Sequence, residues 1–238
     1  MYFKLTMTVV SRTGRASATR EAILVAAERL FAEHGVSAVS LRHIGEAAGQ
    51  GNNTAVSYHF GSKIELIRAI VRKHGEPTEK GRQRMVDALG DAPSVRDWVA
   101  CLVRPVTDHL STLGSPTWFA RFSAQLMTDP GLREIVMTET EVLPSPALRE
   151  ILDGLDCAGP VLPAPVHAER SAMSRHLIVH VCAEFERDLA AGTPGPRSTW
   201  GGVATGLIDA IDALWLAPVT TPIELSQSLD LASLTGIV

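Results

Sequence analysis

The stretch from Ser40 to Leu66, SLRHIGEAAGQGNNTAVSYHFGSKIEL, restricts the fold more than any other part of this sequence. Two short helical patterns flank a bend rich in glycine and asparagine, and a further helical pattern begins directly after them. Glycine readily adopts the backbone conformations that end a helix, so the segment GQGNN separates two helices. Short helices packed around such a turn form a helix-turn-helix, and the second helix of the pair can enter the major groove of DNA.

The ends of these helices are marked by residues that satisfy free backbone groups. Serine, threonine and asparagine side chains accept hydrogen bonds from the first amides of a helix, and glycine allows the left-handed turn that ends one. A serine followed three residues later by glutamate forms a capping box. The predicted caps and ends are Thr19 and Gly35 for the first helix, Ser40 for the second, Asn52 for a very short third helix ending near His59, and the pair Ser62 and Glu65 for the fourth.

The rest of the chain also has helical periodicity, without the alternation that is typical of strands. We therefore expect an all-α protein with a flexible basic arm at 1–18, a three-helix helix-turn-helix domain at 19–64 and a larger C-terminal helical domain at 65–238. Proline and glycine segments divide this larger domain. Its helices are predicted near 78–89, 95–113, 117–128, 131–140, 145–154, 166–191 and 199–216, with a last short helix starting at Thr221.

The composition is typical of a soluble protein of the cytoplasm. Hydrophobic residues make up 45% of the 238 residues, which is enough for a substantial core. No uncharged apolar run approaches the roughly 18 residues that a membrane span needs, and the opening MYFKLTMTVVSRTGRAS lacks the apolar segment of a secretory signal. The three cysteines are widely spaced and include no CxxC pair, which argues against a disulfide framework or a zinc site.

Charge is distributed unevenly along the chain. Residues 1–74 contain 10 Lys and Arg against 5 Asp and Glu, a net charge of +5, whereas the remainder carries −9 and the whole chain −4. The basic part is where a phosphate backbone can bind. The acidic part is repelled by DNA, and this repulsion helps to orient the molecule.

The third helix of the predicted helix-turn-helix domain is rich in short polar side chains. Asparagine can pair with adenine through two hydrogen bonds, and serine and threonine can contact bases or phosphates. Lys63 stands at the start of the next helix, where free backbone amides favour an anion. With the charge asymmetry, these features favour DNA binding over an ordinary helical hairpin with a solvated polar face. The residues expected to contact DNA are Thr19, Arg42, Asn52, Asn53, Thr54, Ser57, Tyr58, His59 and Lys63.

The segment TREAILVAAERLFAEHGVSAVSLRHIGEAAG, followed by YHFGSKIELI, resembles the N-terminal domain of TetR-family transcriptional regulators. The resemblance covers Thr19 to about Ile70. It implies an all-helical, two-domain homodimer whose divergent C-terminal domain binds a small molecule and thereby releases DNA, usually to relieve repression. It also implies that Lys63 touches phosphate. The matching positions are Thr19, Phe31, Gly35, Ile44, Ala48, Gly49, His59, Phe60, Ser62 and Lys63.

Two positions depart from the family pattern. Gly45 replaces the usual alanine inside the second helix, which costs up to about 1 kcal/mol of helix propensity. The stretch from Gly49 to Lys63 is one residue longer than usual, so the expected tyrosine position holds Ser57 while Tyr58 follows it. Which of these two side chains reaches a phosphate stays open.

The basic N-terminal arm has two interpretations. A flexible arm of this kind can enter the minor groove. The alternative, which we favour, is a leader that takes no part in binding, with Met7 as another possible start. The basic residues concerned are Lys4, Arg12, Arg15 and Arg20.

Two segments of the body, WVACLVRPVTDHL and PTWFARFSAQLM, have the composition of a ligand site. Ligand sites combine apolar walls with a few polar groups, although a residue of such a stripe is more often plain core. Pro105 interrupts a helical pattern, as often happens beside cavities. The candidate ligand-binding residues are Trp98, Leu102, His109, Trp118, Phe119, Arg121, Phe122, Gln125 and Leu126.

Reading two DNA half-sites about 34–36 Å apart requires a rigid dimer. The two longest late helices resemble the family's dimer seam, although part of this set is expected to be intramolecular core. The candidate interface residues are Met173, Leu177, Val181, Trp200, Ala204, Leu207, Ile211 and Trp215.

No metal, cofactor or catalytic site is predicted. His176, His180 and Glu184 share one helical face at a spacing that suits metal ligation, but no third segment supplies a partner. The sequence contains no GxSxG, GxxxxGK or GxGxxG motif. We therefore predict a non-enzymatic, cytoplasmic, nucleoid-associated repressor that leaves its operator DNA when a largely apolar small molecule binds. The alternatives are an activator, a regulator tuned by a partner protein, or an all-helical enzyme in which the N-terminal helix-turn-helix has only a structural role.

Overall fold

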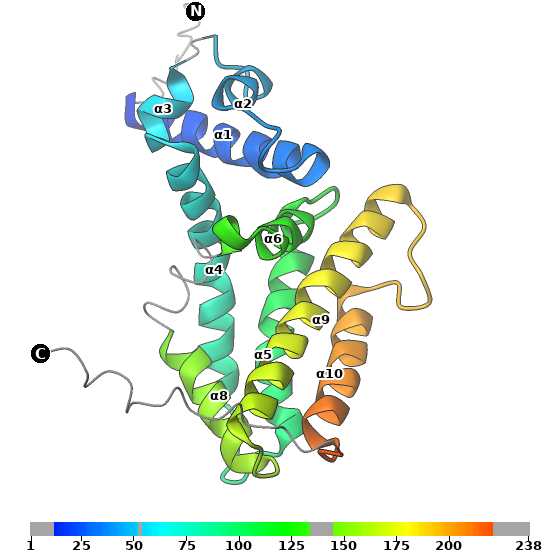
Figure 1. Cartoon of the computed structure of the whole chain (residues 1–238). Coiled ribbons are helices and arrows are strands. Elements are labelled where there is room, and N and C mark those ends of the chain that lie inside the picture. The colour runs from blue at the N-terminus through cyan, green and yellow to red at the C-terminus, as the bar shows by residue number, and fades with distance from the viewer. Residues whose placement is uncertain (1–11, 52–53, 134–144, 221–238) are drawn as a thin grey trace, which may run out of the picture.

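The computed structural model describes residues 12–51, 54–133 and 145–220, and every regular element within these ranges is a helix. Figure 1 shows a small N-terminal group of helices above a larger helical body, with α4 running from one into the other. This arrangement confirms the predicted all-α fold with two parts. The helices are α1 (Arg12–His34), α2 (Leu41–Ala47), α3 (Ala55–Phe60), α4 (Lys63–Val86), α5 (Val95–Thr112), α6 (Phe119–Thr128), α8 (Pro146–Ala158), α9 (Ala164–Ala191) and α10 (Trp200–Leu216).

The N-terminal core is built by α1, α2, α3 and the first turns of α4. Phe31, Ile44 and Ile70 are fully buried in it, and Val56 is 1% exposed. Because α2 and α3 are too short to be stable alone, these apolar contacts hold them in place. The predicted boundary at 64/65 cuts through α4, and the core of this part extends to Ile70.

Helix α6 belongs to the body in sequence but completes the N-terminal core. Phe122 and Leu126 are buried in the same cluster as Phe31, and the rings of Phe31 and Phe122 stack with centroids 5.6 Å apart. The Gln125 side-chain amide donates to the Ala32 carbonyl at 3.1 Å. In Figure 1, α6 accordingly lies between α1 and the long helices of the body.

The start of α6 is held by a buried acid from α9. Glu186 is 1% exposed. Its carboxylate accepts hydrogen bonds from the backbone amides of Ala120 and Arg121 at 3.1 and 2.9 Å and from Arg121 Nε at 3.1 Å. A negative charge at a helix N-terminus satisfies free amides and opposes the positive end of the helix dipole. Glu186 therefore couples the position of α6 to α9.

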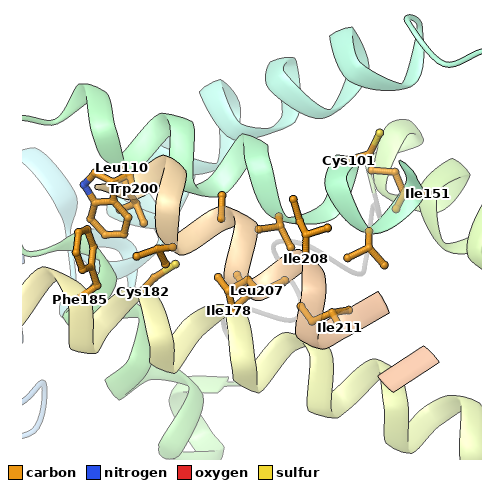
Figure 2. Close-up of a cluster of buried hydrophobic side chains, with 14 of the residues drawn as sticks. Cys101, Leu110, Ile151, Ile178, Cys182, Phe185, Trp200, Leu207, Ile208 and Ile211 are labelled. Carbon is orange, nitrogen blue, oxygen red and sulfur yellow. The ribbon is translucent and has the colours of Figure 1, made fainter. Parts of the chain in front are cut away.

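The core of the body lies where α5, α8, α9 and α10 meet (Figure 2). Ile208 and Ile211 of α10 point into this core with Ile178 of α9 and Ile151 of α8. Helix α8 approaches α5 so closely that a Cβ atom at Gly154 would lie 2.2 Å from the Trp98 ring.

Several predicted helix limits need correction. Helix α1 begins at Arg12, so residues 12–18 of the expected arm are helical and Thr19 is not a cap. Helix α4 runs without a break through Pro77, where two separate helices were predicted. The expected cap Asn52 lies outside the described residues, and α3 begins only at Ala55. Of the predicted helix 131–140, residues 131–133 are described and helical, and the segment from Thr221 is not described.

Other predicted ends are confirmed. The Ser40 hydroxyl accepts from the His43 amide, and the Ser62 hydroxyl accepts from the Glu65 amide, each at 3.2 Å. The second half of the predicted capping box is not formed, because the Glu65 carboxylate pairs with Arg68 at 2.6 Å and the Ser62 amide donates to the Phe60 carbonyl. Gly35 follows α1 with φ of 89°, a value at which only glycine is unstrained.

Gly45 provides a test of the departure noted in α2. A Cβ atom there would lie 3.5 Å from Val56 Cγ2, an ordinary contact, so alanine fits. We expect Gly45→Ala to raise the free energy of unfolding by about 0.5–1 kcal/mol, measured by urea denaturation, because it removes backbone entropy from the unfolded chain.

The matched control is Gly49→Ala at the end of the same helix. Gly49 has φ of 70°, and a Cβ atom there would have nothing within 4 Å, so strain alone should lower the free energy of unfolding by about 1–2 kcal/mol. Two alanine variants with effects of the same sign would contradict this account.

Candidate nucleic-acid interface and adjoining groove

The exposed face of the helix-turn-helix is presented by α3. Val56 and Phe60, four residues apart, are buried and anchor the helix. Ser57 and Tyr58 lie on the opposite side and are exposed, Tyr58 to 85%. A short helix with one anchored face and one polar exposed face has the geometry needed to read a DNA groove.

The beginning of α4 is a candidate anion site beside α3. Ser62 caps this helix and Lys63 is its first residue. The Lys63 ammonium lies 5.8 Å from the centre of the Phe31 ring, and partial burial lowers the pKa of Lys63. The cation stays anchored over an aromatic ring next to free helix amides, a combination that suits a phosphate group.

A further basic residue at this surface is Arg20, which the sequence prediction groups with the arm. It is exposed within α1, and its guanidinium lies 4.8 Å above the centre of the Phe60 ring at the end of α3. The cation–π spacing between Arg20 and Phe60 joins segments 40 residues apart, so helical periodicity could not reveal it.

The other predicted DNA contacts occupy varied positions. Thr54 is exposed directly before α3, while His59 and Thr19 are half-buried. Arg42 is exposed on α2 and pairs with Glu46 at 2.9 Å, and this hydrogen bond raises the pKa of Arg42. Asn52 and Asn53 lie outside the described residues. Both Ser57 and Tyr58 face outward, so the choice between them stays open.

Residues 23–70 match the family described as bacterial regulatory proteins, tetR family. This range contains α2, α3 and the part of α1 and α4 that packs against them. Residues 23–70 therefore form a TetR-type domain. The predicted family resemblance is thereby confirmed.

Named relatives are consistent with this TetR-type assignment. The repressor AcnR of Corynebacterium efficiens is 28% identical over 120 residues, which are 48% of this chain and 54% of AcnR. The chain therefore spans about half the length of this relative. The repressor BepR of Brucella suis is 38% identical over 65 residues, which are 27% of this chain and 31% of BepR.

Solved structures show the same fold over most of the chain. NalD, a repressor of an efflux pump in Pseudomonas aeruginosa, has a TM-score of 0.55 at 23% identity and covers 86% of this chain and 100% of its own. SmeT, the repressor of a Stenotrophomonas maltophilia efflux pump, has a TM-score of 0.53 at 24% identity and covers 87% of this chain and 98% of its own. At these identities the likeness establishes the TetR-like fold of both parts.

A buried polar chain connects the TetR-type domain to the body. His74 of α4 is 2% exposed and lies between Glu28 of α1 and His109 of α5. Its Nε2 atom is 3.1 Å from Glu28 Oε1, and its Nδ1 atom is 2.8 Å from His109 Nε2. Lys73 pairs with Glu28 at 3.1 Å and with Glu21 at 2.7 Å. Three helices from two domains therefore share one set of hydrogen bonds.

Electrostatic interactions within this set of hydrogen-bonded side chains favour an ionised Glu28 and a neutral His109. Burial alone would raise the pKa of Glu28, but hydrogen bonding and attraction from His74 and Lys73 outweigh it and lower this pKa. Burial, followed by repulsion from His74, lowers the pKa of His109 to about 4. Phe119 of α6 stacks on His74 with ring centres 3.7 Å apart and helps to keep water away.

A groove of about 460 Å³ opens beside this polar chain between α4 and α5. His109 is the one predicted ligand residue in its lining, and Pro105 lies there too, as expected for a proline beside a cavity. The complete lining is Pro77, Gly81, Arg84, Met85, Ala88, Pro105, Asp108, His109 and Thr112.

The other predicted ligand residues lie elsewhere. Phe122 and Leu126 are buried in the N-terminal core, Phe119 packs on His74, and Trp98 and Leu102 pack against the core of the body. Trp118 directly precedes α6. Arg121 donates a hydrogen bond to Glu186, and Gln125 donates to the Ala32 carbonyl. An aromatic stripe at helical spacing does not distinguish packing from a pocket wall.

The predicted dimer residues divide between the two late helices. Met173 is 50% exposed, and Leu177 and Val181 are half-buried on α9. The α10 residues are a correction, because they are buried in the protomer's own core and leave almost no surface for a partner. They are Trp200, Ala204, Leu207, Ile211 and Trp215, each no more than 8% exposed.

Membrane-spanning helices and metal-binding clusters are both absent from the described ranges. No helix there combines the length and apolar character needed to span a bilayer. No group of three or more His, Cys, Asp or Glu side chains in the same ranges is arranged to hold a metal ion. His176 and His180 stack on α9 with ring centres 5.8 Å apart.

The lowered pKa of His109 predicts a pH dependence of stability. A ring that titrates near 6.5 when unfolded and at about 4 when folded stabilises the protein fully above pH 6.5. That contribution is lost as the pH falls from 6.5 towards 4, because the unfolded state binds the proton first. We expect His109→Gln to flatten the fall in the free energy of unfolding across this window, measured by urea denaturation at several pH values.

The control variant is His34→Gln, at an exposed histidine at the end of α1. It should retain the wild-type pH profile. If His109→Gln and the wild type lose stability in parallel between pH 6.5 and 4, the assignment of this linkage to His109 is wrong.

Proposed function

We propose that this protein is a homodimeric, TetR-type transcriptional repressor that acts on bacterial operator DNA in the cytoplasm. The observation that carries the proposal is the TetR-type domain at 23–70, which presents the exposed face of α3 beside Lys63. The charge distribution supports it, with +5 in residues 1–74 and −9 in the remainder. Because the TetR-type domain is basic and the body is acidic, contact with DNA phosphates is expected at one end of the molecule.

Repression is favoured over activation by the names of the relatives. AcnR and BepR are both named transcriptional repressors, and NalD and SmeT are repressors of efflux pumps. We expect release from the operator by a small molecule that binds the helical body. We expect no catalytic activity of this body.

Dimerisation is proposed to use the outer face of α9 with the exposed side of α10. Met173 and His180 are exposed on α9. Gly201, Thr205 and Ala213 are exposed on α10 and are small enough for a close approach of two helices. Two protomers joined in this way would present two copies of α3 to successive turns of the DNA, about 34–36 Å apart.

The direct test is a titration of the purified protein against labelled duplexes that tile the region upstream of its own gene, with random duplex as competitor. Saturable binding that survives the competitor, together with lower expression of a reporter placed behind the bound duplex, is expected. Higher reporter expression would make the protein an activator. Binding that the competitor abolishes on every duplex would contradict operator recognition in this region.

Lys63→Ala tests the phosphate contact at the start of α4. We expect the variant to bind all DNA sequences more weakly, because the lost contact is to the backbone. The slope of log K against log salt concentration should flatten by about 1. Fluorescence anisotropy at several salt concentrations measures both effects.

The matched control removes a cation from the body. Arg149 is exposed on α8, away from the proposed dimer face, and Arg149→Ala should leave affinity and salt slope unchanged. A Lys63→Ala variant with the wild-type slope would remove Lys63 from the phosphate contacts. Equal effects of the two variants would show a general charge effect instead.

A further inference from the structure

We propose that the groove between α4 and α5 is the effector site and that it accepts a compact, largely apolar molecule with one anionic group. The inference rests on the repressor function proposed above, because it names the class of molecule that would release the DNA. Three observations carry it, namely the shape of the groove, the cations at its edge and the contact of its lining with the polar chain that reaches α1.

The shape of the groove follows from two prolines on facing helices. Pro77 of α4 and Pro105 of α5 both line it. A proline inside a helix removes one backbone hydrogen bond and pushes its ring against the preceding turn. At Gly81 a Cβ atom would lie 3.1 Å from Pro105 Cβ, so the helices touch there. Pro105, Gly81 and Met85 give the groove an apolar floor, Pro77 and Ala88 lie exposed at its rim, and its volume of about 460 Å³ suits a small organic molecule.

The edge of the groove on α4 is positively charged, although the body as a whole is acidic. Arg84 lines the groove, and Lys80 borders a more open extension that shares Pro77 and Arg84 with it. Arg84 Nε donates to the Lys80 carbonyl at 3.3 Å, and among the described residues no carboxylate lies within ion-pair distance of its guanidinium. A guanidinium without an acidic partner beside an apolar floor matches a carboxylate attached to an apolar group.

The opposite wall carries one acid and one imidazole. Asp108 is exposed, while His109 is half-buried. Two cations therefore face one carboxylate, and the balance of charge favours an anion. His109 Nε2 is taken by His74 at 2.8 Å, which leaves His109 Nδ1 for a ligand.

The hydrogen bonds of His109 connect a ligand in the groove to α1. If His109 Nδ1–H donates to an anion, its Nε2 has no proton and must accept from His74 Nδ1–H. His74 then also donates from Nε2 to Glu28, so it is an imidazolium paired with that carboxylate. The charged groups around this pair are Glu28 and Lys73, with Asp108 on α5. An anion in the groove thus strengthens the ion pair between α4 and α1, and by reciprocity a change in that pair alters affinity for the anion.

The binding test uses the purified full chain and three probes that share one apolar tail, namely decanoate, 1-decanol and decylamine. Isothermal titration calorimetry below their aggregation limits is expected to show that decanoate binds at least about tenfold more tightly than the other two. Equal or tighter binding of decanol or decylamine overturns the anionic class. No measurable binding of decanoate overturns the groove assignment.

Variants locate the site. Arg84→Gln should weaken decanoate binding about tenfold by removing the cation, and Ala88→Phe should weaken it by filling the rim from an exposed position. Arg187→Gln on α9 is the matched control and should bind as the wild type does. Circular dichroism melts confirm that each variant is folded. Wild-type affinity in both groove variants overturns the location.

The last measurement separates this inference from the repressor proposal. Decanoate should change the operator affinity of the wild type by at least about fivefold. In Glu28→Gln, decanoate should still bind while this change is lost, which a merely structural role of Glu28 would not produce. A protein that binds decanoate but no operator fails the repressor proposal alone. Operator binding without decanoate binding fails only the groove assignment.

Discussion

The stacking of Phe122 on Phe31 is the contact on which the rest of the architecture depends, because it places a residue of the body inside the core of the TetR-type domain. A helix of six residues cannot fold alone, and α3 is held by the apolar cluster that α1, α2, α4 and α6 complete. Helix α6 is in turn held at its first turn by Glu186 of α9. The orientation of α3 is therefore tied to the body through packed side chains and not through a flexible linker.

The polar chain at the same junction has a different physical character. An apolar contact between two domains tolerates small shifts, whereas Glu28, His74 and His109 form hydrogen bonds that depend on direction and on the position of a proton. Leaving one of these buried groups without a partner costs about 1–3 kcal/mol. The junction therefore combines a stabilising apolar cluster with a set of bonds that distinguishes between nearby arrangements of α1, α4 and α5.

The parts of this structure that depend on local sequence were predicted well. The Ser40 and Ser62 caps, the end of α1 at Gly35 and the helices of the body follow from spacing and capping chemistry. The prediction failed where tertiary packing decided the outcome, as for α4, which continues through Pro77 because both of its halves are anchored in cores. The ligand and dimer residues failed for a related reason. Trp215 and Phe122 have the size and spacing of interface or pocket residues, and only the fold shows that they are buried in the protomer. Pairings such as Arg20 with Phe60 and His74 with Glu28 join distant segments and leave no local pattern.

We expect Pro77 to divide α4 into two segments with different hydrogen-exchange behaviour. The proline has no amide hydrogen, so the carbonyl of Lys73 lacks its helical donor, although the Thr78 hydroxyl donates to the neighbouring His74 carbonyl at 2.9 Å. Before the proline, Leu66 and Ile70 are fully buried, so amides there exchange only when the whole TetR-type domain opens. After it, amides near Gly81 and Arg84 border the groove and can exchange through local opening of one or two turns. A single continuous helix is thus expected to contain a slowly exchanging half that belongs to the TetR-type domain and a faster half that any occupant of the groove would protect.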